Sequence, residues 1–168
     1  MDSARPSFIV RAIDSKDLGS VIGAIITVRT SAYMEWNGPK SAEEKQAESR
    51  IWQDKIASRN GSAMFIASKD AEMAGYVWGY ETEPKRFYIS HIGVREDCKG
   101  QGLGRILVQQ CEELARLRGC VSISTSTYNR FHGMLILLVK EGYLITAITK
   151  REGDADKGGR IEFEKALS

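Results

Sequence analysis

The sequence predicts an α/β fold, with a mixed central sheet of about seven strands flanked by about four helices in a single domain over residues 1–168. Two observations predict it. Apolar residues change along the chain from strand-like alternation to helix-like spacing and back, and three strand-like runs follow one another in its middle. The 168 residues, 42% hydrophobic and 27% charged, are enough for one core and leave little room for two domains.

The chain begins with one expected strand, residues 8–13, and two expected helices, residues 18–36 and 41–59. The second helix has a clear start, because Ser41 and Glu44 have the spacing of a capping box, in which each side chain accepts a hydrogen bond from the backbone of the other residue. A short break rich in glycine and proline separates the two helices.

The middle and the end of the chain supply the other strands. The hydrophobic period becomes two over residues 63–68, 73–81 and 86–94, which predicts three successive strands in an antiparallel meander. After a glycine-rich loop, the expected order is helix, strand, helix, strand, strand, over residues 105–118, 120–125, 130–142, 143–149 and 160–167.

Composition limits the classes of function. A formal net charge of +2 favours neither nucleic acid nor a membrane surface as a partner. Cys98, Cys111 and Cys120 form no CxxC pair and have no histidine cluster nearby, so neither a disulfide framework nor a metal site is predicted. No apolar run approaches the roughly 20 residues of a membrane span, and none resembles a signal peptide. These observations favour a cytoplasmic protein.

The sequence "KGQGLG", residues 99–104, lies between the third strand of the meander and a helix. Side chains at Gly100, Gly102 and Gly104 would keep a ligand away from the backbone. A bare backbone lets successive N–H groups converge on an anion at the positive end of the helix. The loop lacks the ending of a Walker A motif, and Arg105 stands where a GxGxxG motif requires glycine. A pyrophosphate site of another kind is therefore predicted.

The stretch "IGVREDCKGQGLGR", residues 92–105, resembles the signature of the GNAT superfamily of acyl-CoA-dependent N-acyltransferases. That signature is an apolar strand end, a polar loop, and Arg or Gln followed by x-x-Gly-x-Gly or Ala at the start of a helix. Lys99 stands where Arg or Gln is usual. The order of the expected elements resembles the family's over nearly the whole chain. The resemblance implies the GNAT fold and direct transfer of an acetyl group from acetyl-CoA to a primary amine in a ternary complex.

The resemblance also implies which residues bind acetyl-CoA. Asn129 matches an asparagine that often contacts coenzyme A in the family, and the pantetheine arm is expected to pair with the backbone of Ile92, Gly93 and Val94. The pyrophosphate is expected to be held by Lys99, Gly100, Gln101, Gly102, Leu103, Gly104 and Arg105.

The general base is predicted from chemistry. An ammonium acceptor must lose a proton before it attacks, so a base or a water relay is useful. His91 lies on the strand expected to border the thioester and has the most suitable ordinary pKa, although a packed histidine is the alternative interpretation. Strict alternation places Ser90 and Tyr88 on the face opposite His91. There they would line the acceptor cleft, hold water or form part of the core.

The general acid is the weakest part of the resemblance. Many relatives carry a tyrosine that protonates the departing thiolate, and Leu138 occupies that position. Tyr128 and Tyr143 are candidates to replace it, or they pack as ordinary core residues.

Two alternative functions stay open. One is an acyl-CoA-binding sensor or interaction module without turnover, which the missing tyrosine supports. The other is a toxin-like enzyme that acetylates aminoacyl-tRNA, which the near-neutral charge does not favour. The expected acceptor is the amine of a small molecule or of a protein or peptide, and a homodimer is a further expectation.

Overall fold

A computed structural model describes residues 7–150 and 158–168. It has seven strands and five α-helices in these residues. The strands are β1 (Ile9–Ile13), β2 (Ala63–Lys69), β3 (Glu72–Glu83), β4 (Arg86–Val94), β5 (Ser122–Tyr128), β6 (Leu144–Thr149) and β7 (Arg160–Ala166). The helices are α1 (Leu18–Ala32), α2 (Met34–Asn37), α3 (Ala42–Ala57), α4 (Leu103–Leu117) and α5 (His132–Lys140).

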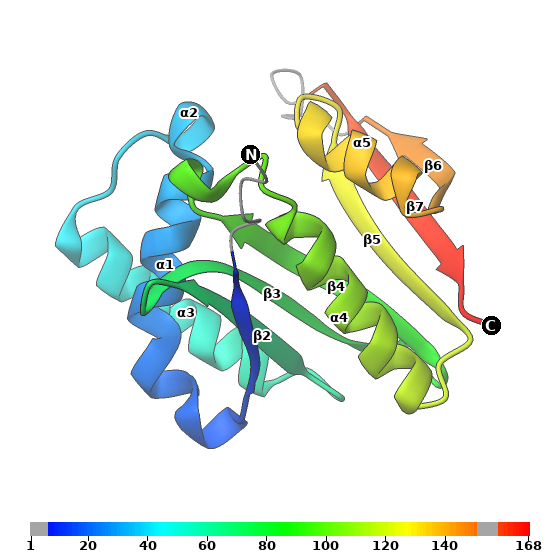
Figure 1. Cartoon of the computed structure of the whole chain (residues 1–168), viewed down its shortest axis with the longest axis horizontal. Helices are drawn as coiled ribbons and strands as arrows, with labels where there is room; N and C mark the ends of the chain where they lie inside the picture. Colours follow the sequence, from blue (N-terminus) through cyan, green and yellow to red (C-terminus); the bar gives the residue numbers. More distant parts are fainter. Residues whose placement is uncertain (1–6, 151–157) are drawn as a thin grey trace, which may run out of the picture.

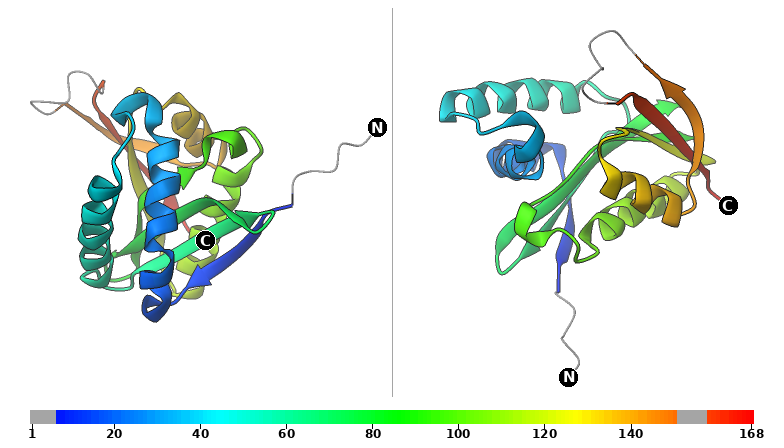
Figure 2. Two further views of the ribbon diagram at one scale, coloured as in Figure 1. Left: turned by 90° about the vertical axis from the view of Figure 1, so that its left-hand side faces the viewer. Right: turned by 90° about the horizontal axis from the view of Figure 1, so that it is seen from above.

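The strands form one mixed sheet in the order β1-β2-β3-β4-β5-β7-β6. The expected meander is confirmed, since β2, β3 and β4 pair antiparallel, whereas β4 and β5 pair parallel. Helices α1 and α3 lie on one side of the sheet, and α4 and α5 lie on the other (Figure 1 and Figure 2). The predicted α/β fold is therefore confirmed.

Each side of the sheet has its own hydrophobic core. The side of α1 and α3 is filled by Trp52, Tyr76 and Trp78 together with aliphatic residues of α1. The side of α4 includes the fully buried Phe87 and Leu107. Burying side chains of this size contributes about 1.5–3 kcal/mol each, so the two cores fix the relative positions of the sheet and the helices.

Two element boundaries differ from those predicted. The helix expected over residues 18–36 is interrupted at Tyr33, whose φ of −117° and ψ of 18° leave the helical region. The fifth strand extends to Tyr128, because β7 pairs with it along its whole length. The capping box of α3 is confirmed, since the Glu44 N–H donates to the Ser41 hydroxyl and the Ser41 N–H donates to the Glu44 carboxylate.

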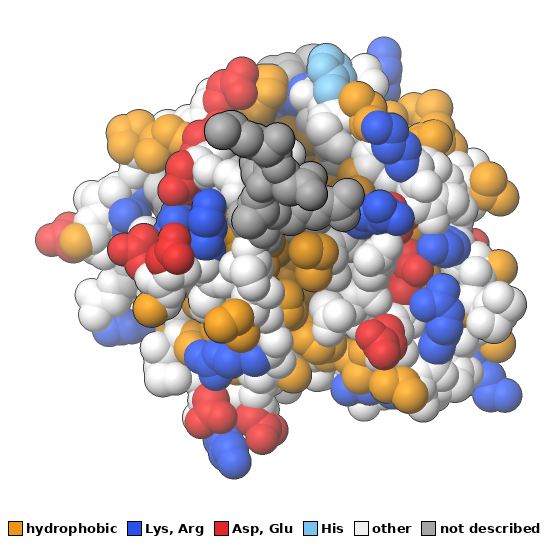
Figure 3. All heavy atoms as spheres, in the orientation of Figure 1, with side chains coloured by type: hydrophobic (Ala, Val, Ile, Leu, Met, Phe, Trp, Pro, Cys, Tyr) orange, Lys and Arg blue, Asp and Glu red, His pale blue; other side chains and the backbone are white. Residues whose placement is uncertain are grey.

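The surface carries a mixture of charges. On the face with α4 and α5, Lys and Arg side chains alternate with Asp and Glu, and neither sign dominates (Figure 3). Among the described residues, no helix has the length and apolar character needed to cross a membrane.

Candidate active site

Strands β4 and β5 separate halfway along their length. Their parallel pairing covers Arg86–Ile89 and 122–125, and no described residue of β4 beyond Ile89 pairs with β5. The remaining segments, residues 90–94 and 126–128, border what we call the β4–β5 opening. The predicted residues Ser90, His91 and Tyr128 all lie on its borders. A sheet that parts between two parallel strands exposes backbone groups that a ligand can use.

A β-bulge marks the start of this opening. Trp78 is opposite His91 and Gly79 is opposite Ile89, so Ser90 has no partner in β3. One extra residue reverses the alternation of side chains beyond it. The predicted placement of Tyr88 opposite His91 is therefore wrong, because both face α1 and α3.

Ring contacts establish that shared face. Tyr88 contacts Tyr80 with a centroid distance of 5.7 Å, and Tyr80 in turn contacts Trp78 at 5.4 Å. The imidazole of His91 lies 4.6 Å from the ring of Trp52 on α3. The bulge therefore brings a phenol and an imidazole to the same side of the sheet.

The glycine loop leaves a row of backbone donors free. Among the described residues, the N–H groups of residues 100–105 have no hydrogen-bond acceptor, and the next one, at Ile106, donates to the Gly102 carbonyl. Gly100 and Gly102 have φ values of 72° and 84°, and no atom lies within 4 Å of a Cβ added at either. This conformation favours glycine, and open space lies above both. Six free N–H groups at the start of α4 fit a pyrophosphate.

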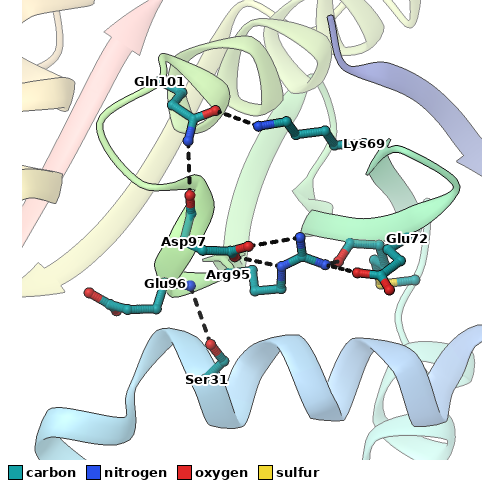
Figure 4. Close-up of polar contacts among 8 residues, drawn as sticks. Ser31, Lys69, Glu72, Arg95, Glu96, Asp97 and Gln101 are labelled. Atoms are coloured by element: carbon teal, nitrogen blue, oxygen red, sulfur yellow. Dashed lines mark hydrogen bonds and ion pairs between the residues drawn. The ribbon is translucent and has the colours of Figure 1, made fainter. Parts of the chain in front are cut away.

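The loop is held in place from both sides (Figure 4). Arg95 donates to both carboxylate oxygens of Asp97, at 2.6 and 3.0 Å, and to Glu72 on β3 at 3.0 Å. The hydrogen bonds from Arg95 lower the pKa of Asp97 below its ordinary value. The Gln101 side chain donates to the Asp97 carbonyl and accepts from Lys69, so it supports the loop from within.

The charged side chains of the loop are bound to the protein. Lys99 donates to the Ala32 carbonyl at 3.1 Å and pairs with Glu96, whereas Arg105 pairs with Glu141, the residue just after α5, at 2.7 Å. Lys99 would have to leave its partners to reach a phosphate, whereas the Arg105 pair uses Nε alone. Among the described residues, the backbone N–H groups and the amino groups of Arg105 therefore supply the free donors.

The remaining predicted residues have mixed surroundings. Leu103 is buried, and a Cβ at Gly104 would lie 3.3 Å from Leu137, so both positions serve packing around α4. Val94 packs against the same core. Asn129 is exposed just after β5, and its N–H donates to the Gly159 carbonyl.

Tyr33 is a site residue that the sequence did not indicate. Its hydroxyl donates to the Ile92 carbonyl at 2.8 Å, so that acceptor is already used on the edge expected to pair with pantetheine. Burial raises the pKa of Tyr33 above its ordinary value.

Gly93 is explained by packing, because a Cβ there would lie 2.5 Å from the ring of Tyr76.

His91 is enclosed by aromatic rings and cations. Burial, with Arg29 and Lys55 nearby, lowers its pKa to about 3. The imidazole is therefore neutral at pH 7 but is a weak acceptor for the proton of an ammonium group. The base role stays a prediction, and these surroundings count against it.

A polar hollow of about 240 Å³ lies beside the opening, on the same side of the sheet as His91. Figure 2 shows that α1 and α3 stand over the other half of the sheet. The Tyr88 hydroxyl shares a 2.8 Å hydrogen bond with Ser126 and accepts one from Arg160 at 3.1 Å. Sequence analysis missed this group, although alternation along β7 indicates the face shared by Arg160 and Glu162. The lining residues are Arg86, Tyr88, Ser124, Thr125, Ser126, Thr146, Arg160, Glu162, Phe163 and Glu164.

The two tyrosines considered as acids are in different places. Tyr143 is buried in the core with α4, and burial, reinforced by the Glu112 carboxylate, raises its pKa well above the ordinary value. Tyr128 lies at the border of the opening, with its ring 6.2 Å from that of Phe131. Leu138 is fully buried, so no proton donor replaces tyrosine at that position.

Comparisons with known proteins agree with this geometry. Residues 7–133 match the model of the acetyltransferase (GNAT) family. A putative GNAT acetyltransferase from Desulfovibrio desulfuricans superposes with a TM-score of 0.76 at 17% identity, covering 96% of this chain and 100% of that one.

Two further structures are similar. The ribosomal-protein-S18-alanine N-acetyltransferase of Escherichia coli has a TM-score of 0.74 at 16% identity, covering 96% of this chain and 95% of its own. The paia N-acetyltransferase of Thermoplasma acidophilum, solved in complex with coenzyme A, has a TM-score of 0.67 at 14% identity, covering 95% and 99%. No curated protein sequence matches the chain. With more than half of its length matched by the family model, the chain belongs to the acetyltransferase (GNAT) family.

Proposed function

We propose that the protein transfers an acetyl group from acetyl-CoA to a primary amine, directly and within a ternary complex. The observation that carries the proposal is the position of the six free N–H groups of residues 100–105 next to the β4–β5 opening. The polar hollow lies beside the same opening. A donor and an acceptor bound at these two places would meet where β4 and β5 separate.

The reaction does not require a dedicated general acid. The amine nitrogen forms a bond to the acetyl carbon, the carbon–sulfur bond breaks, and the sulfur leaves as a thiolate that takes up a proton. A thiol has a reference pKa near 8.5, so the thiolate is a tolerable leaving group without a proton donor. The buried Leu138 is therefore compatible with turnover.

Removal of the amine proton has a candidate route through the hollow. A lysine-like ammonium, with a pKa near 10.4, costs roughly 4–5 kcal/mol to deprotonate at neutral pH. The hydroxyls of Tyr88 and Ser126 lie on the acceptor side and can hold a water molecule that carries the proton away. With this relay, His91 does not have to accept the proton directly from the amine.

Thiol release tests the proposal. The protein is mixed with acetyl-CoA and a panel of small amines, peptides with free N-termini and aminoacylated tRNA, and free thiol is measured. Amine-dependent release supports the proposal, and the active class of amine identifies the acceptor. Binding of acetyl-CoA without release from any mixture would favour the sensor or interaction module instead.

The two tyrosines give a matched pair of variants. We expect Tyr143→Phe to leave turnover at saturating acetyl-CoA within about threefold of the parent, because Tyr143 is buried in the core with α4. Tyr128→Phe is expected to lower it by less than about tenfold, since water can protonate the thiolate. A loss of about 10³-fold in Tyr128→Phe alone would show that this phenol is the general acid.

The acceptor and the assembly are proposed in general terms. Structures similar to this chain are named for acetylation of ribosomal protein S18 and of aminoglycosides, so both protein and small-molecule amines are represented. The homodimer and the cytoplasmic location stay predictions. In support of the dimer, the edge strand β6 exposes Leu144 and Ile148 at 73% and 67%.

A further inference from the structure

The polar hollow contains charges that do not neutralise one another. Two arginines and two glutamates line it. Arg86 is paired with Glu164 at 3.8 Å. Arg160 and Glu162 have no ion pair with any described residue. Within residues 7–150 and 158–168, the hollow therefore presents one guanidinium and one carboxylate without partners of opposite charge.

Arg160 is held in a position that suits a ligand. It is partly buried, one of its amino groups donates to the Tyr88 hydroxyl at 3.1 Å, and its buried Nε makes no hydrogen bond with described residues. A guanidinium carries five donors in a fixed planar arrangement that matches carboxylate and phosphate. Because no described residue neutralises its charge in this partly buried site, Arg160 is expected to attract an anion.

Arg160 and Glu162 act as a pair by position. They are two residues apart on β7, so they face the same side, and their Cα atoms are about 7 Å apart. Their partners across the strand pair are Tyr128 and Ser126, which border the β4–β5 opening. A cation and an anion so close together complement a small molecule that carries both charges.

We propose that the acceptor is a small amine that also carries an anionic group, either a carboxylate or a phosphate. Arg160 binds the anionic group, and Glu162 faces the ammonium before it loses its proton. This inference rests on the proposed function and adds the class of acceptor. It also explains the presence of Arg160 in the hollow, since an amine without an anionic group would pair with Glu162 but leave Arg160 without a partner of opposite charge.

Matched acceptors test the inference. Thiol release is measured with an amino acid and its carboxamide, and with an aminoalkyl phosphate and the corresponding amino alcohol. Each pair differs only in the anionic group, and comparison of the two pairs distinguishes carboxylate from phosphate. We expect kcat/KM to be at least about 30-fold higher for the anionic member of one pair, which corresponds to one charge-assisted hydrogen-bonded contact of about 2 kcal/mol.

Variants assign the preference to Arg160. Arg160→Gln is expected to remove the preference for the anionic amine by raising the KM for that amine. The KM for the neutral amine should change little. Arg86→Gln is the matched control, because that arginine lines the same hollow but is already paired, and it should keep the preference. Tyr88→Phe removes the hydrogen bond between the Tyr88 hydroxyl and Arg160. This variant should also keep the preference for the anionic amine.

The outcomes separate the two proposals. If none of the amines tested gives thiol release, the proposed function is overturned. Release with equal kcat/KM for both members of both pairs overturns the inference alone. Equal losses for anionic and neutral amines in Arg160→Gln, in a variant with native circular dichroism, also overturn it, because Arg160 would then only position Tyr88.

Discussion

Gly102→Val is expected to weaken acetyl-CoA binding by at least 100-fold in calorimetry. Gly102 has a φ of 84°, which a β-branched residue tolerates poorly, and its N–H is one of six free donors at the start of α4. Relaxing the strain turns the neighbouring N–H groups away from the phosphate. Hydrogen bonds to a charged group contribute about 1.5–3 kcal/mol each, so losing two of them accounts for the expected change.

Gly119→Val is the matched control for this experiment. Gly119 has a φ of 73° and open space around it, so valine brings similar backbone strain. It lies just past the other end of α4, away from the loop. The affinity of the Gly119→Val variant for acetyl-CoA should equal that of the parent protein. The assignment of the loop would be contradicted if Gly102→Val bound acetyl-CoA as tightly as the parent protein. It would also be contradicted if both variants lost the same affinity while their circular dichroism stayed native.

The fold and the glycine loop could be predicted because their causes are local. Period-two and period-3.6 patterns report which faces are buried, and the glycines of "KGQGLG" report a bare backbone before a helix. The structure adds the row of free N–H groups and shows that Lys99 and Arg105 are paired with Glu96 and Glu141. The Lys99–Glu96 pair spans three residues and is local, whereas the pairing of Arg105 with Glu141 joins residues whose proximity depends on the fold, so no spacing in the sequence indicates it.

The acceptor side could not be predicted for a related reason. A bulge has no reliable sequence signature, and the one at Ser90 reverses the direction of every later side chain in β4. The group of Tyr88, Ser126 and Arg160 joins three strands, and the two residues of the Arg160–Tyr88 hydrogen bond are 72 positions apart in the sequence. Alternation along β7 places Arg160 on one face, but only the sheet order brings it beside β4.

His91 should make the protein lose stability in mild acid. Its pKa of about 3 in the folded state lies below the ordinary value of 6.5, because burial and nearby cations disfavour the imidazolium. The unfolded chain therefore binds the proton more readily. The stabilisation is fully present above pH 6.5 and is lost as the pH falls toward 3. The full loss is about 5 kcal/mol, of which about 1.5 kcal/mol falls between pH 6.5 and 5.

Urea unfolding at pH 6.5, 6.0, 5.5 and 5.0 measures this dependence above the range in which most carboxylates titrate. The parent protein should lose about 1.5 kcal/mol more of its free energy of unfolding over this interval than His91→Gln, which has no imidazole at that position. His132→Gln is the control, because His132 is exposed, and it should behave like the parent. If the parent and His91→Gln show the same slope, the imidazole titrates near its ordinary pKa. The neutral, packed histidine would then be the wrong interpretation, and His91 would regain its place as the candidate general base.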